Sequence, residues 1–370
     1  MNILKKDKLE SLYPIIKEEE LHGRQIVFDD LEASIKNLSS KFEKHKIGSS
    51  VNNIPIYKIT IGNGKTRVLS WSQMHGNEST GTKALFDLFN FLDNSDPYSS
   101  IVNQQILNNT SLVFIVLLNP DGAVEFTRVN SQGIDLNRDA VEQKAPESQI
   151  LRRELNDFNP HYCFNLHDQR SIFNVKGTEN PATLSFLAPS EDAERTLTQG
   201  RKETMSVIVT MNALLQEMIP NQIGRYTDEF YPTATGDNFQ KLGHNTILIE
   251  AGHFKDDYDR EVTRKYNFYA LLQGLYTLGQ NEIKLNFKPY FNIPNNDTKY
   301  LDIIYTNVTV FEKDQPILSD VGIQIKFEMK DGVFMRIDHI EKIGDLSGYF
   351  ANNWINANKR GINELELSDS

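Results

Sequence analysis

The sequence of 370 residues contains one cysteine, Cys163. A single cysteine excludes an intramolecular disulfide and a cysteine-rich zinc site, so a bound metal ion would need histidine and carboxylate ligands. The chain also lacks a surplus of positive charge, because 39 Lys and Arg stand against 50 Asp and Glu and give a net charge of −11. This balance disfavours nonspecific binding to nucleic acid or to anionic membranes. We therefore expect neither as a partner.

Long hydrophobic runs are missing from the start of the chain. The first 21 residues, MNILKKDKLESLYPIIKEEEL, carry a charge every few residues and contain no apolar run of seven. This pattern is typical of neither a signal peptide nor a membrane span, so we expect a cytoplasmic protein. No internal repeat with a period of 20–50 residues is visible either, which disfavours a solenoid or a propeller.

The first third of the chain shows two kinds of periodicity. Apolar residues recur every three to four positions between Leu31 and Phe42, and we expect residues 1–50 to form an opening helical segment. Residues 54–59 and 67–71 read as strands, and the turn-prone sequence 62–65 between them predicts a hairpin.

Strands and helices then alternate. Residues 112–118 are a continuous apolar run typical of a buried strand, and residues 162–166 and 246–249 also read as strands. Residues 147–158, 192–218 and 258–279 are typical of helices. This order predicts an α/β fold, namely a mixed open sheet with helices on both faces, with ligands bound at the carboxyl ends of the strands.

The pattern changes near residue 285. Beyond it, three stretches read as strands without intervening helices: 300–311, 321–329 and 333–340. We therefore divide the chain into a catalytic domain, 1–285, and a small β-rich C-terminal module, 286–370. No motif in the module indicates its role.

Polar residues with metal-binding chemistry follow the predicted strands. His75 and Glu78 come after the strand that ends near residue 71, His167 follows the strand 162–166, and Glu250 follows the strand 246–249. Positions three apart at a helix entry lie on one face, so His75 and Glu78 can meet one metal ion. His167 would complete a His₂Glu zinc site with an open position for water. His253 and Asp256, also three apart, form a rival pair without a partner motif.

Further motifs appear in a fixed order around these residues. Asn119-Pro120-Asp121-Gly122 and Arg128 precede Gly133-Ile134-Asp135-Leu136-Asn137-Arg138. Together with the ligands, they resemble the zinc metallocarboxypeptidase family, the M14-type peptidases, and especially its compact bacterial members, over about residues 25–280. The resemblance implies that His75, Glu78 and His167 bind one Zn²⁺ per chain.

The same resemblance implies roles for the other residues. Glu250 would be the general base, and Arg128 would polarise the scissile carbonyl and stabilise its oxyanion. Asn137 and Arg138 would dock the free carboxylate of the substrate, a task that suits the bidentate geometry of a guanidinium. The mobile tyrosine that covers the substrate in this family would be Tyr231, with Tyr226 also in range. Asp168, next to His167, departs from the small polar residue expected in digestive-type relatives, and it would support a ligand or act as a pocket acid.

These motifs predict a zinc-dependent metallopeptidase that hydrolyses the C-terminal peptide bond of small peptides. An alternative is an N-acyl amino acid deacylase of the aspartoacylase or succinylglutamate desuccinylase type, which shares the metal motifs and a β-rich C-terminal module. A third possibility is a non-catalytic relative that binds carboxylates. In each case the expected partner is a small peptide or acyl-amino acid with a free carboxylate. The sequence leaves the side-chain preference and the oligomeric state open.

Overall fold

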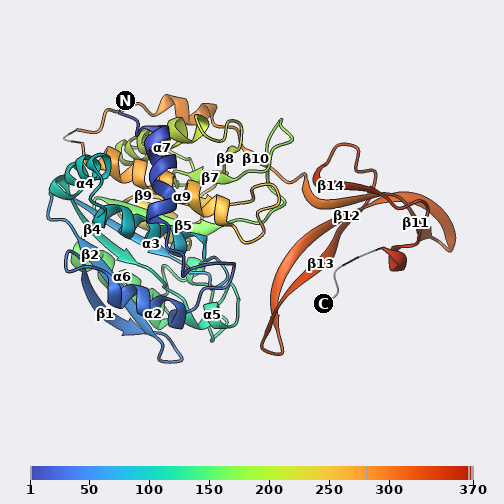
Figure 1. Cartoon of the computed structure of the whole chain (residues 1–370), viewed down its shortest axis with the longest axis horizontal. Helices are drawn as coiled ribbons and strands as arrows, with labels where there is room; N and C mark the ends of the chain where they lie inside the picture. Colours follow the sequence, from blue (N-terminus) through green and yellow to red (C-terminus); the bar gives the residue numbers. More distant parts are fainter. Residues whose placement is uncertain (1, 281, 366, 368–370) are drawn as a thin grey trace.

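A computed structural model describes residues 2–280, 282–365 and 367 (Figure 1). Its centre is an eight-stranded mixed sheet with the strand order β1-β2-β4-β3-β5-β9-β7-β8. The strands are β1 (Glu43–Ser49), β2 (Pro55–Ile61), β3 (Thr66–Ser72), β4 (Thr110–Ile115), β5 (Tyr162–Asp168), β7 (Leu184–Leu187), β8 (Ile223–Arg225) and β9 (Asn245–Ala251).

The middle of this sheet is parallel. Strand β3 pairs with β4 and β5, and β5 pairs with β9, all in the parallel sense, whereas β2 and β7 join this core antiparallel. Every residue of β5 is buried. Parallel strands are covered on both faces, and their carboxyl ends meet at one edge of the sheet. The ends of β3, β5 and β9 therefore bring their neighbouring loops together.

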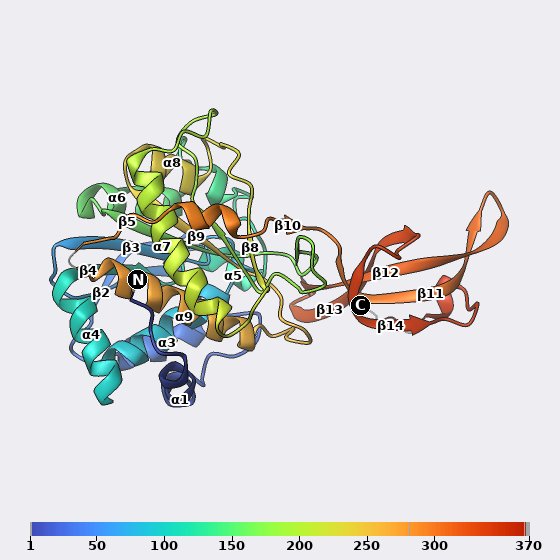
Figure 2. The ribbon, with the colours of Figure 1, turned by 90° about the horizontal axis from the view of Figure 1, so that it is seen from above.

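Helices cover both faces of the central sheet. Figure 2 shows α6 and α8 on one side and α1, α3, α4 and α9 on the other. The helices are α1 (Lys6–Ile16), α2 (Phe28–Asn37), α3 (Thr80–Asp93), α4 (Pro97–Asn109), α5 (Pro120–Val124), α6 (Pro146–Phe158), α7 (Gln199–Gln216), α8 (Thr235–Lys241) and α9 (Glu261–Leu278). A large apolar cluster packs α3, α7 and α9 on one face, and a smaller cluster containing Trp71 packs α6 and α8 on the other. The predicted fold class is confirmed.

Two predictions for the start of the chain are wrong. The opening segment is helical only in α1 and α2, and residues 43–49 form the edge strand β1. Strands β2 and β3 do not form a hairpin, because β4 lies between them and pairs with both. The turn signal at residues 62–65 is real, but Gly64 passes so close to Asn109 and Thr110 that a Cβ atom would lie 1.9 Å from the Asn109 carbonyl carbon. Residues 62–65 therefore pass around the start of β4, and β2 and β3 each pair with β4 instead of with each other.

A second, four-stranded sheet follows with the order β13-β12-β11-β14. It consists of β11 (Tyr300–Glu312), β12 (Gln315–Lys330), β13 (Val333–Gly344) and β14 (Phe350–Asn356). Figure 1 shows it beside the larger α/β body, with the β12–β13 hairpin running along that body. A short two-stranded sheet of β6 (Asn174–Val175) and β10 (Asn296–Asp297) links the two parts. In the described part of the chain, no helix has the length and apolar character needed to cross a membrane.

Candidate active site

The loop after β3 is held in place by tight backbone contacts. A Cβ atom on Gly76 would lie 1.9 Å from the carbonyl carbon of Gly122, so only glycine fits here. Asn119 braces the same contact, because its side-chain amide donates to the Met74 carbonyl at 3.2 Å and its side-chain oxygen accepts from the Gly122 amide at 2.9 Å. The Asn-Pro-Asp-Gly turn thus fixes the backbone directly before His75.

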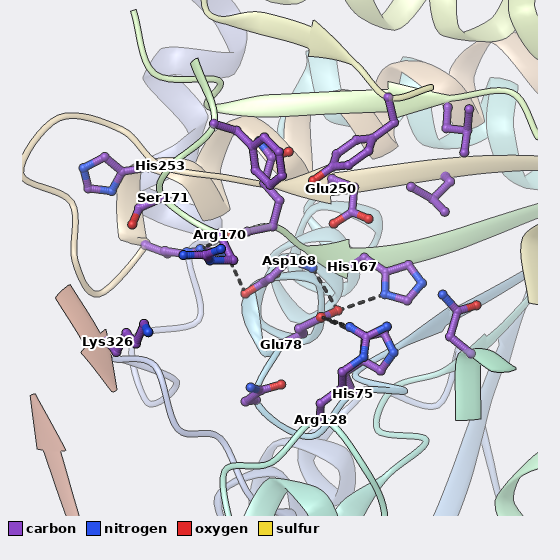
Figure 3. A pocket seen from close by; sticks show the side chains of 18 of the residues that line it. His75, Glu78, Arg128, His167, Asp168, Arg170, Ser171, Glu250, His253 and Lys326 are labelled. Carbon is purple, nitrogen blue, oxygen red and sulfur yellow. Dashed lines mark hydrogen bonds and ion pairs between the residues drawn. The ribbon is translucent and has the colours of Figure 1, made fainter. Parts of the chain in front are cut away.

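His75, Glu78 and His167 converge at the carboxyl edge of the sheet. All three are buried, and one ligand atom from each lies within 4.8 Å of the other two. The Glu78 carboxylate lies between the two imidazoles, with Oε1 2.8 Å from His75 Nδ1 and Oε2 2.8 Å from His167 Nδ1 (Figure 3). The backbone amide of Asp168 also donates to Glu78 Oε2 at 3.1 Å. Both histidines therefore present the same nitrogen to one point.

Asp135 connects His75 to Arg128. The Asp135 carboxylate lies 3.1 Å from His75 Nε2 and accepts from Arg128 Nε at 2.9 Å. Arg128 is half-exposed, and its Nη1 lies 3.6 Å from Glu78 Oε1. When His75 Nε2 donates to Asp135, the other ring nitrogen, Nδ1, keeps the lone pair that a metal ion requires.

The pKa values of His75 and Glu78 follow from their burial and from their charged neighbours. Burial favours the neutral forms, but Glu78 and Asp135 outweigh it at His75 and raise the pKa of His75 to about 9. Burial alone would raise the pKa of Glu78, yet the two imidazoles hold the pKa of that carboxyl well below its usual range. Glu78 is therefore a carboxylate, which is the form that binds a cation.

Glu250 faces the ligand group from the next strand. It lies on β9 directly opposite His167 in the parallel pairing of β5 with β9, where strands are about 4.8 Å apart. Burial raises the pKa of Glu250 well above its usual range, and the Glu78 carboxylate raises it further. No side-chain hydrogen bond holds the Glu250 carboxylate in the described part of the chain, and it lines the cleft beside the ligands.

The ligand group opens into a cleft of about 630 Å³. All eight predicted site residues line this cleft: His75, Glu78, Arg128, Asn137, Arg138, His167, Tyr231 and Glu250. Asn137 and Arg138 lie on a short 3-10 helix, Leu136–Arg138, and Asn137 accepts from the backbone amide of Thr235 at 3.0 Å.

The two candidate tyrosines differ in their surroundings. Tyr231 is exposed, its hydroxyl donates to Glu229 at 3.0 Å, and its ring lies 6.0 Å from the Arg138 guanidinium. Tyr226 lies deeper, where burial and the Glu250 carboxylate raise the pKa of its hydroxyl. Tyr231 is thus next to the predicted carboxylate clamp and Tyr226 is close to the predicted base. The role of Tyr231 stays a prediction.

The model of the zinc carboxypeptidase family Peptidase_M14 matches residues 28–219. The chain belongs to this family. It is 28% identical over 194 residues to Carboxypeptidase SOL1 of Arabidopsis thaliana, and this match covers 46% of the chain but only 39% of SOL1.

Solved zinc carboxypeptidase-like structures share the fold. A metallo-carboxypeptidase from Burkholderia cenocepacia superposes with a TM-score of 0.56 at 14% identity, over 68% of each chain. The metallo-carboxypeptidase of Pseudomonas aeruginosa in complex with (2-guanidinoethylmercapto)succinic acid superposes with a TM-score of 0.55 at 16% identity, over 69% of each chain. At these identities the similarity concerns the fold alone.

The ligand group of this family member fits one zinc ion. Zinc accepts imidazole nitrogen and carboxylate oxygen, and a catalytic zinc ion takes three protein ligands and keeps a further position for water or substrate. Among the described residues, His75, Glu78 and His167 are the one group of three that could hold a metal ion. The rival histidine, His253, accepts from Asn352 at 3.2 Å at the junction with the second sheet and takes no part in such a group.

Some contacts and residues of the site cannot be predicted from the sequence. Asp135 belongs to a motif, but its bonds to His75 and Arg128 depend on how that loop folds. Asp168 accepts from Thr80 at 2.7 Å and pairs with Arg260 at 3.1 Å, so it helps to hold the backbone amide that binds Glu78. Strand β12 of the second sheet also lines the cleft, and its residues lie more than 70 positions beyond the last motif.

Proposed function

We propose that the protein is a zinc-dependent carboxypeptidase that removes the C-terminal residue of small peptides. One observation carries the proposal: the buried His75-Glu78-His167 group shares a cleft with a facing carboxylate, Glu250, and with the guanidinium groups of Arg128 and Arg138. These are the parts that hydrolysis of a terminal peptide bond needs, namely a metal site, a base, an oxyanion donor and a carboxylate clamp.

Glu250 is the proposed general base. A zinc ion held by the three ligands supplies Lewis acidity, which polarises a carbonyl group and lowers the pKa of a water molecule. Glu250 has no competing hydrogen bond within the described residues, and its raised pKa suits a group that first accepts a proton and then returns it to the leaving amine. Its position opposite His167 brings it to the same end of the sheet as the ligands.

Arg128, Asn137 and Arg138 are the proposed substrate-binding groups. Arg128 uses Nε to hold Asp135, and its Nη1 reaches the ligand group, where it can donate to a developing oxyanion. Arg138 is exposed in the cleft and can bind a carboxylate bidentately. Asn137, which accepts from the Thr235 amide, lines the cleft next to Arg138, and Tyr231 beside Arg138 is the proposed cover.

A deacylase is the second candidate, because the β-rich module contributes strand β12 to the lining of the cleft, and deacylases of the aspartoacylase type share such a module. The test is to offer the zinc-loaded protein blocked dipeptides with free C-termini and, in parallel, N-acetyl and N-succinyl amino acids. We expect release of the C-terminal residue from the dipeptides. Cleavage of the N-acyl amino acids alone would reject the carboxypeptidase in favour of the deacylase.

A further inference from the structure

The second sheet supplies part of the wall of the active-site cleft. Five consecutive residues of β12, from Gln324 to Glu328, line the same cleft as His75, Glu78 and His167. They include an apolar side chain, Phe327, and a cation, Lys326. Figure 3 shows Lys326 on the same side of Glu78 as Arg170 and Ser171, away from Glu250 and His167.

Polar contacts hold this wall against the α/β body. Buried Asn352 of β14 accepts from Tyr300 at 2.8 Å and donates to Tyr258 at 2.9 Å and to His253 at 3.2 Å. Closer to the cleft, the Ser171 hydroxyl donates to Gln324 at 3.2 Å. The contacts are largely buried, which fixes β12 relative to the central sheet.

An ion pair and two aromatic contacts add to this attachment. Arg170, three residues after His167, pairs with Glu341 of β13 at 2.9 Å. Nearer the turn of the hairpin, Phe334 packs edge-on against Phe126 with ring centroids 4.8 Å apart, and it also stacks on Phe327 at 5.5 Å. The hairpin therefore contacts the body through both Arg170 and Phe126, which line the cleft, and these contacts hold it in position.

Two cations line this side of the cleft, Lys326 on β12 and Arg170 on the loop after β5. Among the described residues, Lys326 has no ion-pair partner, and Arg170 pairs with Glu341 of β13 but keeps half of its side chain exposed. Arg24 also lines the cleft, but it is partly buried and the carboxylates of three aspartates act on its charge. Asp and Glu are as numerous as Lys and Arg in the lining of the whole cleft, so any attraction for an anion is local to Lys326 and Arg170.

These cations lie apart from the proposed carboxylate clamp. Asn137 is tied to Thr235 and Arg138 lies over Tyr231, so the clamp is at the start of α8. Lys326 and Arg170 lie where β12 meets the loop after β5. A peptide whose terminal carboxylate occupies the clamp would therefore extend its preceding residues past the metal ligands toward β12.

We propose that Lys326, together with Arg170, forms a cationic subsite that binds an acidic side chain on the N-terminal side of the scissile bond. The subsite rests on the proposed function, since the direction of the substrate follows from the clamp. The preferred substrates are short peptides with Asp or Glu one or two residues before the C-terminal residue. An exposed lysine and a carboxylate attract each other weakly, and two cations beside one carboxylate give an expected preference of about two- to fivefold.

The test compares matched peptides on the zinc-loaded, full-length protein. The pairs are acetyl-Ala-Glu-Xaa with acetyl-Ala-Gln-Xaa and acetyl-Glu-Ala-Xaa with acetyl-Gln-Ala-Xaa, where Xaa is the best C-terminal residue of a panel. We expect kcat/KM to favour one glutamate peptide by about two- to fivefold at low salt and less at high salt. In Lys326→Gln the preference should disappear, and in Lys326→Glu it should reverse.

Lys330→Gln is the matched control, because Lys330 lies on the same strand, is exposed and does not line the cleft. It should keep the wild-type preference. Equal kcat/KM for both members of each pair in the wild type, or an unchanged preference in Lys326→Gln, would overturn the subsite while leaving the carboxypeptidase intact.

Calorimetric measurement of the binding of the same peptides distinguishes recognition at the subsite from hydrolysis. Tighter binding of a glutamate peptide, lost in Lys326→Gln, without any hydrolysis would support the subsite and reject the proposed function. Absence of both binding preference and hydrolysis would reject both.

Discussion

Asp135 offers a sharp test of how the loop before Arg138 supports the metal site. Its carboxylate holds the ring of His75 at 3.1 Å and the guanidinium of Arg128 at 2.9 Å, and its side chain is 22% exposed. Replacing it by alanine removes both charge-assisted bonds and frees His75 to rotate and to exchange its tautomer. Loss of a residue that hydrogen-bonds to a metal-binding histidine typically lowers metal affinity or activity by about 10- to 100-fold, which corresponds to about 1.4–2.7 kcal/mol.

The assay is competition for zinc between the protein and a chelator of known affinity, followed by kcat/KM at saturating zinc. We expect Asp135→Ala to bind zinc about 10- to 100-fold more weakly, and to remain slower when fully loaded because Arg128 has lost its anchor. The control is Asp139→Asn: Asp139 accepts from the backbone amides of Lys144 and Ala145 and contacts neither His75 nor Arg128. Wild-type zinc affinity in Asp135→Ala would refute this reasoning.

Three other predictions concern the ligands, the clamp and the second sheet. Glu78→Ala should abolish stoichiometric zinc in metal analysis, and about one zinc per chain in that variant would exclude the site. Arg138→Gln should lower kcat/KM by about 10- to 100-fold with partial recovery in Arg138→Lys, because lysine keeps the charge but not the bidentate geometry; unchanged kcat/KM would exclude the clamp. Burial raises the pKa of Asp302 to about 6. The folded protein therefore loses stability as the pH rises from about 4 to 6, because the buried carboxyl group must then give up its proton. Asp302→Asn does not titrate, so its melting temperature relative to that of the wild type should rise over the same pH range. A constant difference between pH 4 and 7 would contradict the raised pKa.

The sequence predicted those parts of the fold and the site that depend on local patterns. Strand-like runs marked β3, β4, β5 and β9, and the polar residues at or just beyond their carboxyl ends were expected to meet at one edge, because parallel strands share that edge. His75 and Glu78 after β3, His167 at the end of β5 and Glu250 at the end of β9 could be identified in this way without any knowledge of long-range packing. Their convergence in one cleft agrees with that expectation.

The parts that the sequence did not predict depend on pairing between distant segments. Residues 54–71 contain the signals of a hairpin, yet β4, some 40 residues later, inserts between the two strands. Likewise, no local pattern shows that Lys326 reaches the cleft, because its position depends on contacts such as Ser171 with Gln324, which are 153 residues apart. Edge strands such as β1 are also polar, so their periodicity is weak.

The most direct test of the central claim is the activity of Glu250→Gln at full zinc occupancy. The substitution keeps the size of the side chain and removes its ability to accept the proton. We predict about one zinc per chain and a rate of peptide hydrolysis lower than that of the wild type by about 10²- to 10⁴-fold. Turnover like that of the wild type, with zinc retained, would contradict the proposal that Glu250 is the base of this carboxypeptidase.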